Sequence, residues 1–161
     1  MDYVLKTLPT WATLAGYLAA CASAAATGAL FPTGAWYAGL RKPRWTPPNR
    51  VFPVAWTLLY ILIAVAAWWV ALSPSVLALP ALALWSWQIV VNALWTPVFF
   101  GLRRPGAGLA VIAVLWLAVA ATTWAFWRVS AFAGLLMTPY LAWVSFAAAL
   151  NLSIWRLNRR A

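Results

Sequence analysis

Five apolar stretches, each close to twenty residues long, constrain what this chain can fold into more than any other feature. A helix of about twenty residues spans the hydrocarbon core of a bilayer, which is about 30 Å thick. Only 7% of the 161 residues are charged, whereas a soluble domain carries about 25% to cover its surface. The stretches also lack the alternation of barrel strands, so only helices could satisfy their backbone hydrogen bonds within a membrane. The sequence therefore predicts an all-α membrane protein, a bundle of five transmembrane helices.

Breaks between the stretches set the expected helix bounds. Proline, glycine and serine punctuate the chain there, as in the SPS turn at residues 73–75 and the RRPG break at residues 103–106. We expect a single transmembrane domain over residues 1–161, with helices over residues 9–30, 51–72, 76–100, 106–127 and 131–156.

One connection is longer than the others. Residues 31–50, here named the lid loop, read FPTGAWYAGLRKPRWTPPNR and are rich in Trp, Tyr and Pro. Connections of about twenty residues are uncommon in compact domains and usually functional. Proline stiffens this segment and its aromatic rings need a surface to rest on. We expect a long structured loop that covers one mouth of the bundle.

The basic residues indicate how the helices cross the membrane. Nine of the eleven fall on the side of the lid loop and the C-terminus: Arg41, Lys42, Arg44, Arg50, Arg103, Arg104, Arg156, Arg159 and Arg160. Lys6 and Arg128 fall on the other side. By the positive-inside rule, the lid loop and the C-terminus face the cytoplasm and the N-terminus lies outside. Because the charges sit at helix ends, the net charge of +10 predicts no nucleic-acid partner.

Several kinds of chemistry are excluded by what the chain lacks. It has no His, one acidic residue (Asp2) and one Cys (Cys21). Acid–base triads, carboxylate pairs, zinc or di-iron sites and intramembrane proton relays all need residues from that set. We therefore expect no acid–base catalytic residue, no metal site and no required cofactor. Function must rest on aromatic surfaces, amides, hydroxyls and arginine.

The 14 tryptophans divide by their position in the spans. Seven lie near span ends, where Trp commonly anchors a helix at the membrane interface: Trp11, Trp68, Trp69, Trp95, Trp124, Trp127 and Trp155. Trp36 and Trp45 lie in the lid loop. Five sit deeper, where an indole either packs between helices or lines a pocket: Trp56, Trp85, Trp87, Trp116 and Trp143. Trp85 and Trp87 point to different helix faces, so at least one is expected to face lipid or a second subunit.

The roles of the polar and small residues inside the spans are not fixed by the sequence, and two interpretations stay open for each group. Gln88 and Asn92 lie one turn apart, and they either clamp helices together or aim at a ligand carbonyl or carboxylate. Asn151 is expected to cap or clamp the last helix near its end. A ridge of small residues at four-residue spacing permits close helix approach, within a monomer or across a dimer; it comprises Gly16, Ala20, Ala24 and Gly28.

Five sequence blocks resemble the translocator protein family, also known as tryptophan-rich sensory proteins or peripheral-type benzodiazepine receptors. They are WYAGLRKPRWTPP at residues 36–48, FPVAWTLLY at 52–60, NALWTPVFFG at 92–101, PYLAW at 139–143 and AALNLSIWR at 148–156. The resemblance implies a five-helix bundle, commonly a homodimer, in a bacterial inner or mitochondrial outer membrane. The Ala-, Trp- and Arg-rich composition is typical of a bacterial member.

The same resemblance implies a pocket beneath the lid loop. Its ligands in the family are porphyrins such as protoporphyrin IX or haem, synthetic isoquinoline or benzodiazepine-type compounds and, in some members, sterols. The positions that match the family's pocket are Tyr37, Trp56, Tyr60, Asn92, Trp95, Trp143 and Ala147. The family's light-dependent porphyrin breakdown is linked to the positions of Trp56 and Trp143.

Two positions depart from the family pattern. The sterol-recognition stretch of mammalian members has a Tyr between its Leu and its Arg, and here Leu150, Leu152 and Arg156 occupy the stretch without one. Ala107 replaces a pocket tryptophan of animal members. The first departure makes sterol recognition doubtful, and the second predicts an enlarged or reshaped cavity.

The leading hypothesis is a porphyrin-binding membrane protein with a regulatory, transport or stress-sensing role. One alternative is a light-dependent porphyrin-degrading enzyme with Trp56 and Trp143 as redox-active indoles. A second is a passive transporter of porphyrin or sterol-like lipids, and a third is a structural dimeric scaffold.

Overall fold

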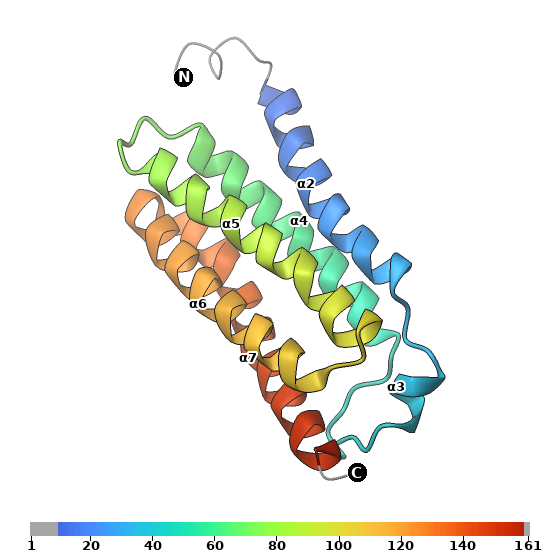
Figure 1. The fold of residues 1–161 in the computed structure, drawn as a ribbon. Helices are drawn as coiled ribbons and strands as arrows, with labels where there is room; N and C mark the ends of the chain where they lie inside the picture. The colour runs from blue at the N-terminus through green and yellow to red at the C-terminus, as the bar shows by residue number, and fades with distance from the viewer. Residues whose placement is uncertain (1–9, 160–161) are drawn as a thin grey trace.

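The computed structural model describes residues 10–159 (Figure 1). Five helices in this part of the chain are long and apolar enough to cross a membrane, and the predicted all-α membrane fold is confirmed. The elements are α2 (Thr10–Leu30), α3 (Ala35–Gly39), α4 (Val51–Ala71), α5 (Ala78–Thr96), the π-helical turn η1 (Pro97–Gly101), α6 (Pro105–Val129) and α7 (Ala131–Asn158). The predicted start at Pro9, the charges of Lys6 and Arg160, and Asp2 lie outside the described residues.

The observed helices differ from the expected ranges by a few residues at their ends. The fourth span starts at Pro105 rather than at residue 106, because proline suits the first turn of a helix, where its missing N–H costs nothing. The third span begins at Ala78, after the SPS turn, and its last turn is η1.

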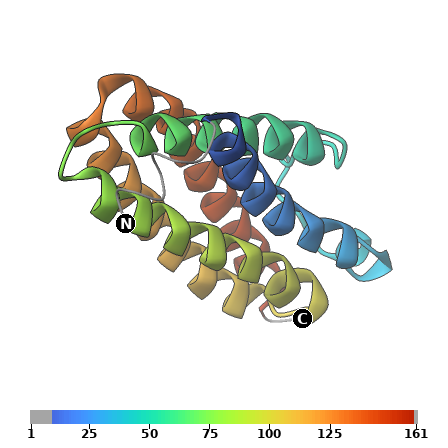
Figure 2. The same ribbon diagram turned by 90° about the horizontal axis from the view of Figure 1, so that it is seen from above.

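The helices form a ring in an order that differs from their order in sequence. α2 packs on α4 and α5, α4 packs on α7, α7 on α6, and α6 on α5 (Figure 2). The first and third helices are therefore neighbours, and α7 lies between the second and fourth. This order lets aromatic residues of α4, α5 and α7 surround the same part of the interior.

η1 ends the third span at the lid end of the bundle. Proline has no N–H, so Pro97 cannot continue the α-helical hydrogen bonding, and the amide of Leu102 instead donates to the Pro97 carbonyl over 2.8 Å. The wider turn buries Phe99 and holds Phe100 beside it, ring centroids 4.8 Å apart. Arg103 then takes a left-handed conformation with φ of 55° and reverses the chain into α6.

α2 is the least buried of the long helices. Only Cys21 and Ala24 on it are buried. Of the ridge of small residues, Ala24 and the half-buried Ala20 face the other helices, whereas Gly16 and Gly28 are exposed. Within a monomer, then, the ridge supports close approach only in its middle.

The lid loop is folded, and it is attached to the bundle by specific contacts. Tyr37 of α3 is buried, and its ring meets the Phe100 ring edge-on at 5.3 Å. The Asn158 side chain accepts a hydrogen bond from the Arg41 amide at 3.0 Å and donates one to the Arg41 carbonyl at 2.9 Å. These bonds tie the lid to the end of α7, so the lid loop and the end of α7 lie at the same end of the bundle (Figure 1).

Candidate functional site

A cavity of about 820 Å³ lies beneath the lid, between all five long helices. Ligand pockets for drug-sized molecules usually measure about 300–1,000 Å³ and are mostly apolar with a few polar groups. The cavity fits this description in size and in lining. Each of the seven positions predicted from the sequence lines it: Tyr37, Trp56, Tyr60, Asn92, Trp95, Trp143 and Ala147.

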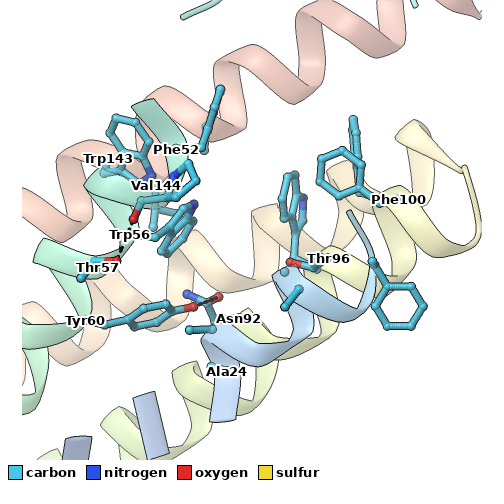
Figure 3. A pocket seen from close by; sticks show the side chains of 18 of the residues that line it. Ala24, Phe52, Trp56, Thr57, Tyr60, Asn92, Thr96, Phe100, Trp143 and Val144 are labelled. Atoms are coloured by element: carbon cyan, nitrogen blue, oxygen red, sulfur yellow. Dashed lines mark hydrogen bonds between the residues drawn. The ribbon is translucent and has the colours of Figure 1, made fainter. Parts of the chain in front are cut away.

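Aromatic rings from α4 and α7 form one wall of the cavity (Figure 3). Trp56 and Tyr60 lie one turn apart on α4, with ring centroids separated by 5.4 Å and planes tilted by 31°. On the facing helix, the Trp143 ring meets Phe52 edge-on at 6.0 Å. A flat apolar ligand could therefore rest against ring surfaces on two helices.

A second aromatic group lies on the α5 side, near the lid. Trp95 and Phe99 stack at 5.0 Å with 24° between their planes. The Trp95 indole N–H donates to the Asn151 side chain at 3.1 Å, and the Asn151 amide donates to the Pro105 carbonyl at 2.8 Å. Asn151 thus joins α7 to α5 and to the start of α6, and the clamp expected at this position is confirmed.

A hydrogen-bonded chain of polar side chains begins at the inner end of the cavity. The Tyr60 hydroxyl donates to Asn92 Oδ1 at 3.0 Å, Asn92 Nδ2 donates to the Tyr140 hydroxyl at 2.6 Å, and that hydroxyl donates to Gln88 Oε1 at 2.8 Å. Tyr60 and Asn92 line the cavity (Figure 3), whereas Tyr140 and Gln88 are not among the lining residues. The two amides therefore clamp α4, α5 and α7, as in the first alternative, and Asn92 also keeps access to the cavity.

Two buried donors in this region have no partner among residues 10–159. They are Gln88 Nε2, at the far end of the chain of hydrogen bonds, and Trp143 Nε1, on the cavity wall. Buried N–H groups without a partner are rare in folded proteins and call for an explanation.

Contacts around Tyr37 hold the lid side of the cavity. Burial raises the pKa of the Tyr37 phenol above its usual value, so the hydroxyl stays neutral at physiological pH. The Lys42 ammonium lies 4.5 Å from the centre of the Tyr37 ring and donates to the carbonyls of Ala38 and Leu40. Tyr37 therefore lines the cavity as a neutral side chain.

The cavity is not enclosed on its membrane side. Exposed residues of both α2 and α4 line it, among them Ala22 and Ala25 on α2 and Thr57 and Ile61 on α4. The cavity thus opens between these two helices, and in a bilayer such an opening faces lipid.

The structure revises part of the sorting of tryptophans. Trp95 lies near a span end, yet it lines the cavity and is not an interfacial anchor, because Asn151 holds its indole inward. Trp116 lies in the middle of its span as expected, but it does not line the cavity: it is 38% exposed, and its indole N–H donates to Ser145 Oγ on α7 at 2.7 Å. Trp85 is buried and Trp87 is 56% exposed, which confirms that the two face opposite ways.

Sequence reasoning missed several residues that shape this site. Tyr140 lies one turn before Trp143 on the same helix face, and that spacing alone was enough to identify it as a candidate. Asn158 and Phe99 gave no comparable signal, since both roles depend on contacts with the lid, through Arg41 and Trp36 respectively.

A comparison with known protein families matches residues 10–156 to the TspO/MBR family. The chain belongs to this family. The match covers every long helix and the lid loop, and it confirms the resemblance drawn from the five sequence blocks.

Three curated relatives are similar over nearly their whole length. Protein CrtK of Rhodobacter capsulatus is 53% identical over 88% of this chain and 90% of its own. The tryptophan-rich sensory protein of Cereibacter sphaeroides is 49% identical over 92% of each chain. The human translocator protein is 36% identical over 93% of this chain and 92% of its own. Together with the five apolar helices, these relatives make the chain an integral, multi-pass membrane protein with a sensory or transport role.

Proposed function

We propose that the cavity binds porphyrins, and other planar apolar ligands of similar size, in a regulatory, transport or stress-sensing role. The observation that carries this proposal is the wall of ring faces and edges that Trp56 and Trp143 build on two facing helices of a cavity of about 820 Å³. Planar aromatic ligands gain most from such surfaces.

The basic residues of the lid loop favour a ligand that carries carboxylates at its edge. Arg41, Arg44 and Arg50 all belong to the lid loop, which lines the cavity through Tyr37 and Asn49, and guanidinium groups pair well with carboxylates. The propionates of a porphyrin would point toward them while the ring lies among the tryptophans. Because the chain has no His, it would hold a metal-free porphyrin, or haem by its edge, without an axial imidazole.

Titration of the purified protein with protoporphyrin IX tests the proposal through quenching of tryptophan fluorescence. We expect saturable quenching, and a dissociation constant about three- to tenfold weaker in Trp143→Phe, because the larger indole contributes more aromatic contact than a phenyl ring. Trp87→Phe is the matched control, since Trp87 is exposed and does not line the cavity. Non-saturable quenching, or equal weakening in both variants, would contradict the proposal.

A second candidate function is light-dependent breakdown of the bound porphyrin. The feature that favours it is Trp143, whose indole lies on the cavity wall with its buried Nε1 unpartnered within the described residues. Illumination of the complex in air, followed by porphyrin absorbance, tests this candidate. Bleaching at the wild-type rate in both Trp56→Phe and Trp143→Phe would show that the two indoles take no part in the reaction.

Passive transfer of porphyrin or sterol-like lipids is supported by the opening between α2 and α4, which gives a ligand access from the bilayer. Flux of porphyrin across liposomes that contain the protein is the direct measurement. A variant with Ile61→Trp at the opening should slow the flux by a larger factor than it weakens equilibrium binding.

We propose a bacterial inner-membrane protein, with the lid and the C-terminus in the cytoplasm and the N-terminus outside. Eight basic residues of the described chain belong to the lid end: Arg41, Lys42, Arg44, Arg50, Arg103, Arg104, Arg156 and Arg159. Arg128 is at the opposite end. We also propose a homodimer, which light scattering in detergent would test.

A further inference from the structure

The hydrogen-bonded chain behind the cavity has a direction, and that direction sets what the cavity offers to a ligand. Tyr60 uses its hydroxyl hydrogen on Asn92, so its oxygen presents only lone pairs to the cavity. In this state the inner end of the cavity accepts hydrogen bonds and pairs with a ligand N–H or O–H.

Every side chain in this row of hydrogen bonds can also exchange its roles as donor and acceptor. Amide side chains have a donor and an acceptor end, and a phenol can donate or accept. If both amides turn by 180°, Gln88 donates to Tyr140, Tyr140 to Asn92, and Asn92 to Tyr60. The Tyr60 hydroxyl hydrogen is then free to point into the cavity, where it pairs with a ligand carbonyl or carboxylate.

Gln88 makes the two directions comparable in free energy. It is completely buried, and in the observed direction its Nε2 has no partner among residues 10–159. In the reversed direction its Oε1 would lose its partner instead. Each direction therefore leaves one end of the same buried amide unpaired, and a single new hydrogen bond from a ligand is enough to select between them.

We infer that Gln88 and Tyr140, which do not line the cavity, are positioning residues that let its inner end serve as hydrogen-bond donor or acceptor according to the ligand. The ligand class is therefore planar apolar molecules with one polar group of either kind, such as a pyrrole N–H, a hydroxyl or a carbonyl. Because it assumes that the cavity binds a ligand, this inference rests on the proposed function.

Three probes of one shape separate the two directions. Fluorenone has a carbonyl that only accepts, carbazole has an N–H that only donates, and fluorene has neither. With wild-type protein, tryptophan quenching should show both polar probes binding more tightly than fluorene. Binding of fluorene and protoporphyrin without any advantage for the polar probes overturns the inference alone. Absence of saturable binding by all four compounds overturns the proposed function.

Gln88→Leu should hold the remaining hydrogen bonds in the reversed direction. The Tyr140 hydroxyl loses its acceptor at position 88 and must donate to Asn92 Oδ1, which forces the Tyr60 hydrogen toward the cavity. The fluorenone-to-carbazole affinity ratio should rise about tenfold, the scale set by leaving a buried donor unpaired. Gln88→Met, which keeps nearly the same volume, should give the same shift and replaces Gln88→Leu if that variant does not fold.

Tyr140→Phe removes the hydroxyl that links Asn92 to Gln88, and it supplies the decisive comparison. In this background, Gln88→Leu should no longer change the ratio, because position 88 has lost its connection to Asn92. Thr122→Val is the matched control, since the Thr122 hydroxyl is buried but bonds only to its own helix. A ratio that is unchanged in Gln88→Leu, or that shifts equally with and without the Tyr140 hydroxyl, overturns the inference.

Discussion

Helix α4 has a different character at each end. At the end remote from the lid it packs through Ile63, Ala67 and Val70, none of which has exposed surface. Two turns closer to the lid, the same helix presents Trp56 and Tyr60 to a cavity. α7 repeats the contrast, with Ala133 fully buried near its start and Trp143 beside the cavity.

Side-chain size accounts for the difference between these two halves. Helices in lipid associate mainly through close van der Waals contact, which small residues permit. Gly134, for example, lets Trp127 approach so closely that an added Cβ would lie 2.4 Å from the indole. Around Trp143, by contrast, large rings stand between α4 and α7: Phe52 and Trp143 meet edge-on with 6.0 Å between their centroids. Close packing in the half remote from the lid thus holds the helices together, and the aromatic half near the lid can contain a cavity.

The largest effect should come from overfilling the packed half. Ala67→Phe places a ring where α4 has no free space, and overpacking of this kind costs about 3 kcal/mol or more. We expect a marked fall in the melting temperature and in the yield of folded protein. Ala149→Phe, at an exposed position of α7, is the control. A melting temperature equal to that of the control would mean that the packed half tolerates rearrangement.

The same substitution in the pocket half should spare stability and remove binding. Ala147 is half-buried and lines the cavity, so Ala147→Phe fills space that is empty of side chains. We expect a melting temperature close to that of wild type and at least about tenfold weaker protoporphyrin binding, because the ring takes up volume the ligand needs. Unchanged affinity would show that the ligand binds elsewhere.

The smallest effect concerns how the lid is attached. Asn158→Ala removes both hydrogen bonds to Arg41, each worth about 0.5–1.5 kcal/mol. Hydrogen exchange at the Arg41 amide should accelerate about fivefold or more, and porphyrin should dissociate faster. Asn158→Asp keeps the acceptor for the Arg41 amide and should give the weaker effect. An Arg41 amide that exchanges at the wild-type rate in Asn158→Ala would contradict this role.

Much of the fold followed from local sequence, whereas much of the site did not. Apolar runs of span length specify membrane helices without reference to any neighbour, and five such helices are observed. Trp95 could not be placed correctly in this way. The direction in which an indole points depends on the helix that packs beside it, as Asn151 shows for Trp95.

By itself, the sequence determined the number of spans, the structured lid and the aromatic residues available for a pocket. It did so because hydrophobicity, proline content and residue type act within one segment of chain. Only the tertiary structure decided that α7 lies between α4 and α6. That order joins Tyr60, Asn92, Tyr140 and Gln88 into one chain of hydrogen bonds. Such bonds form between residues up to 52 positions apart, and their geometry exists only once the helices have packed.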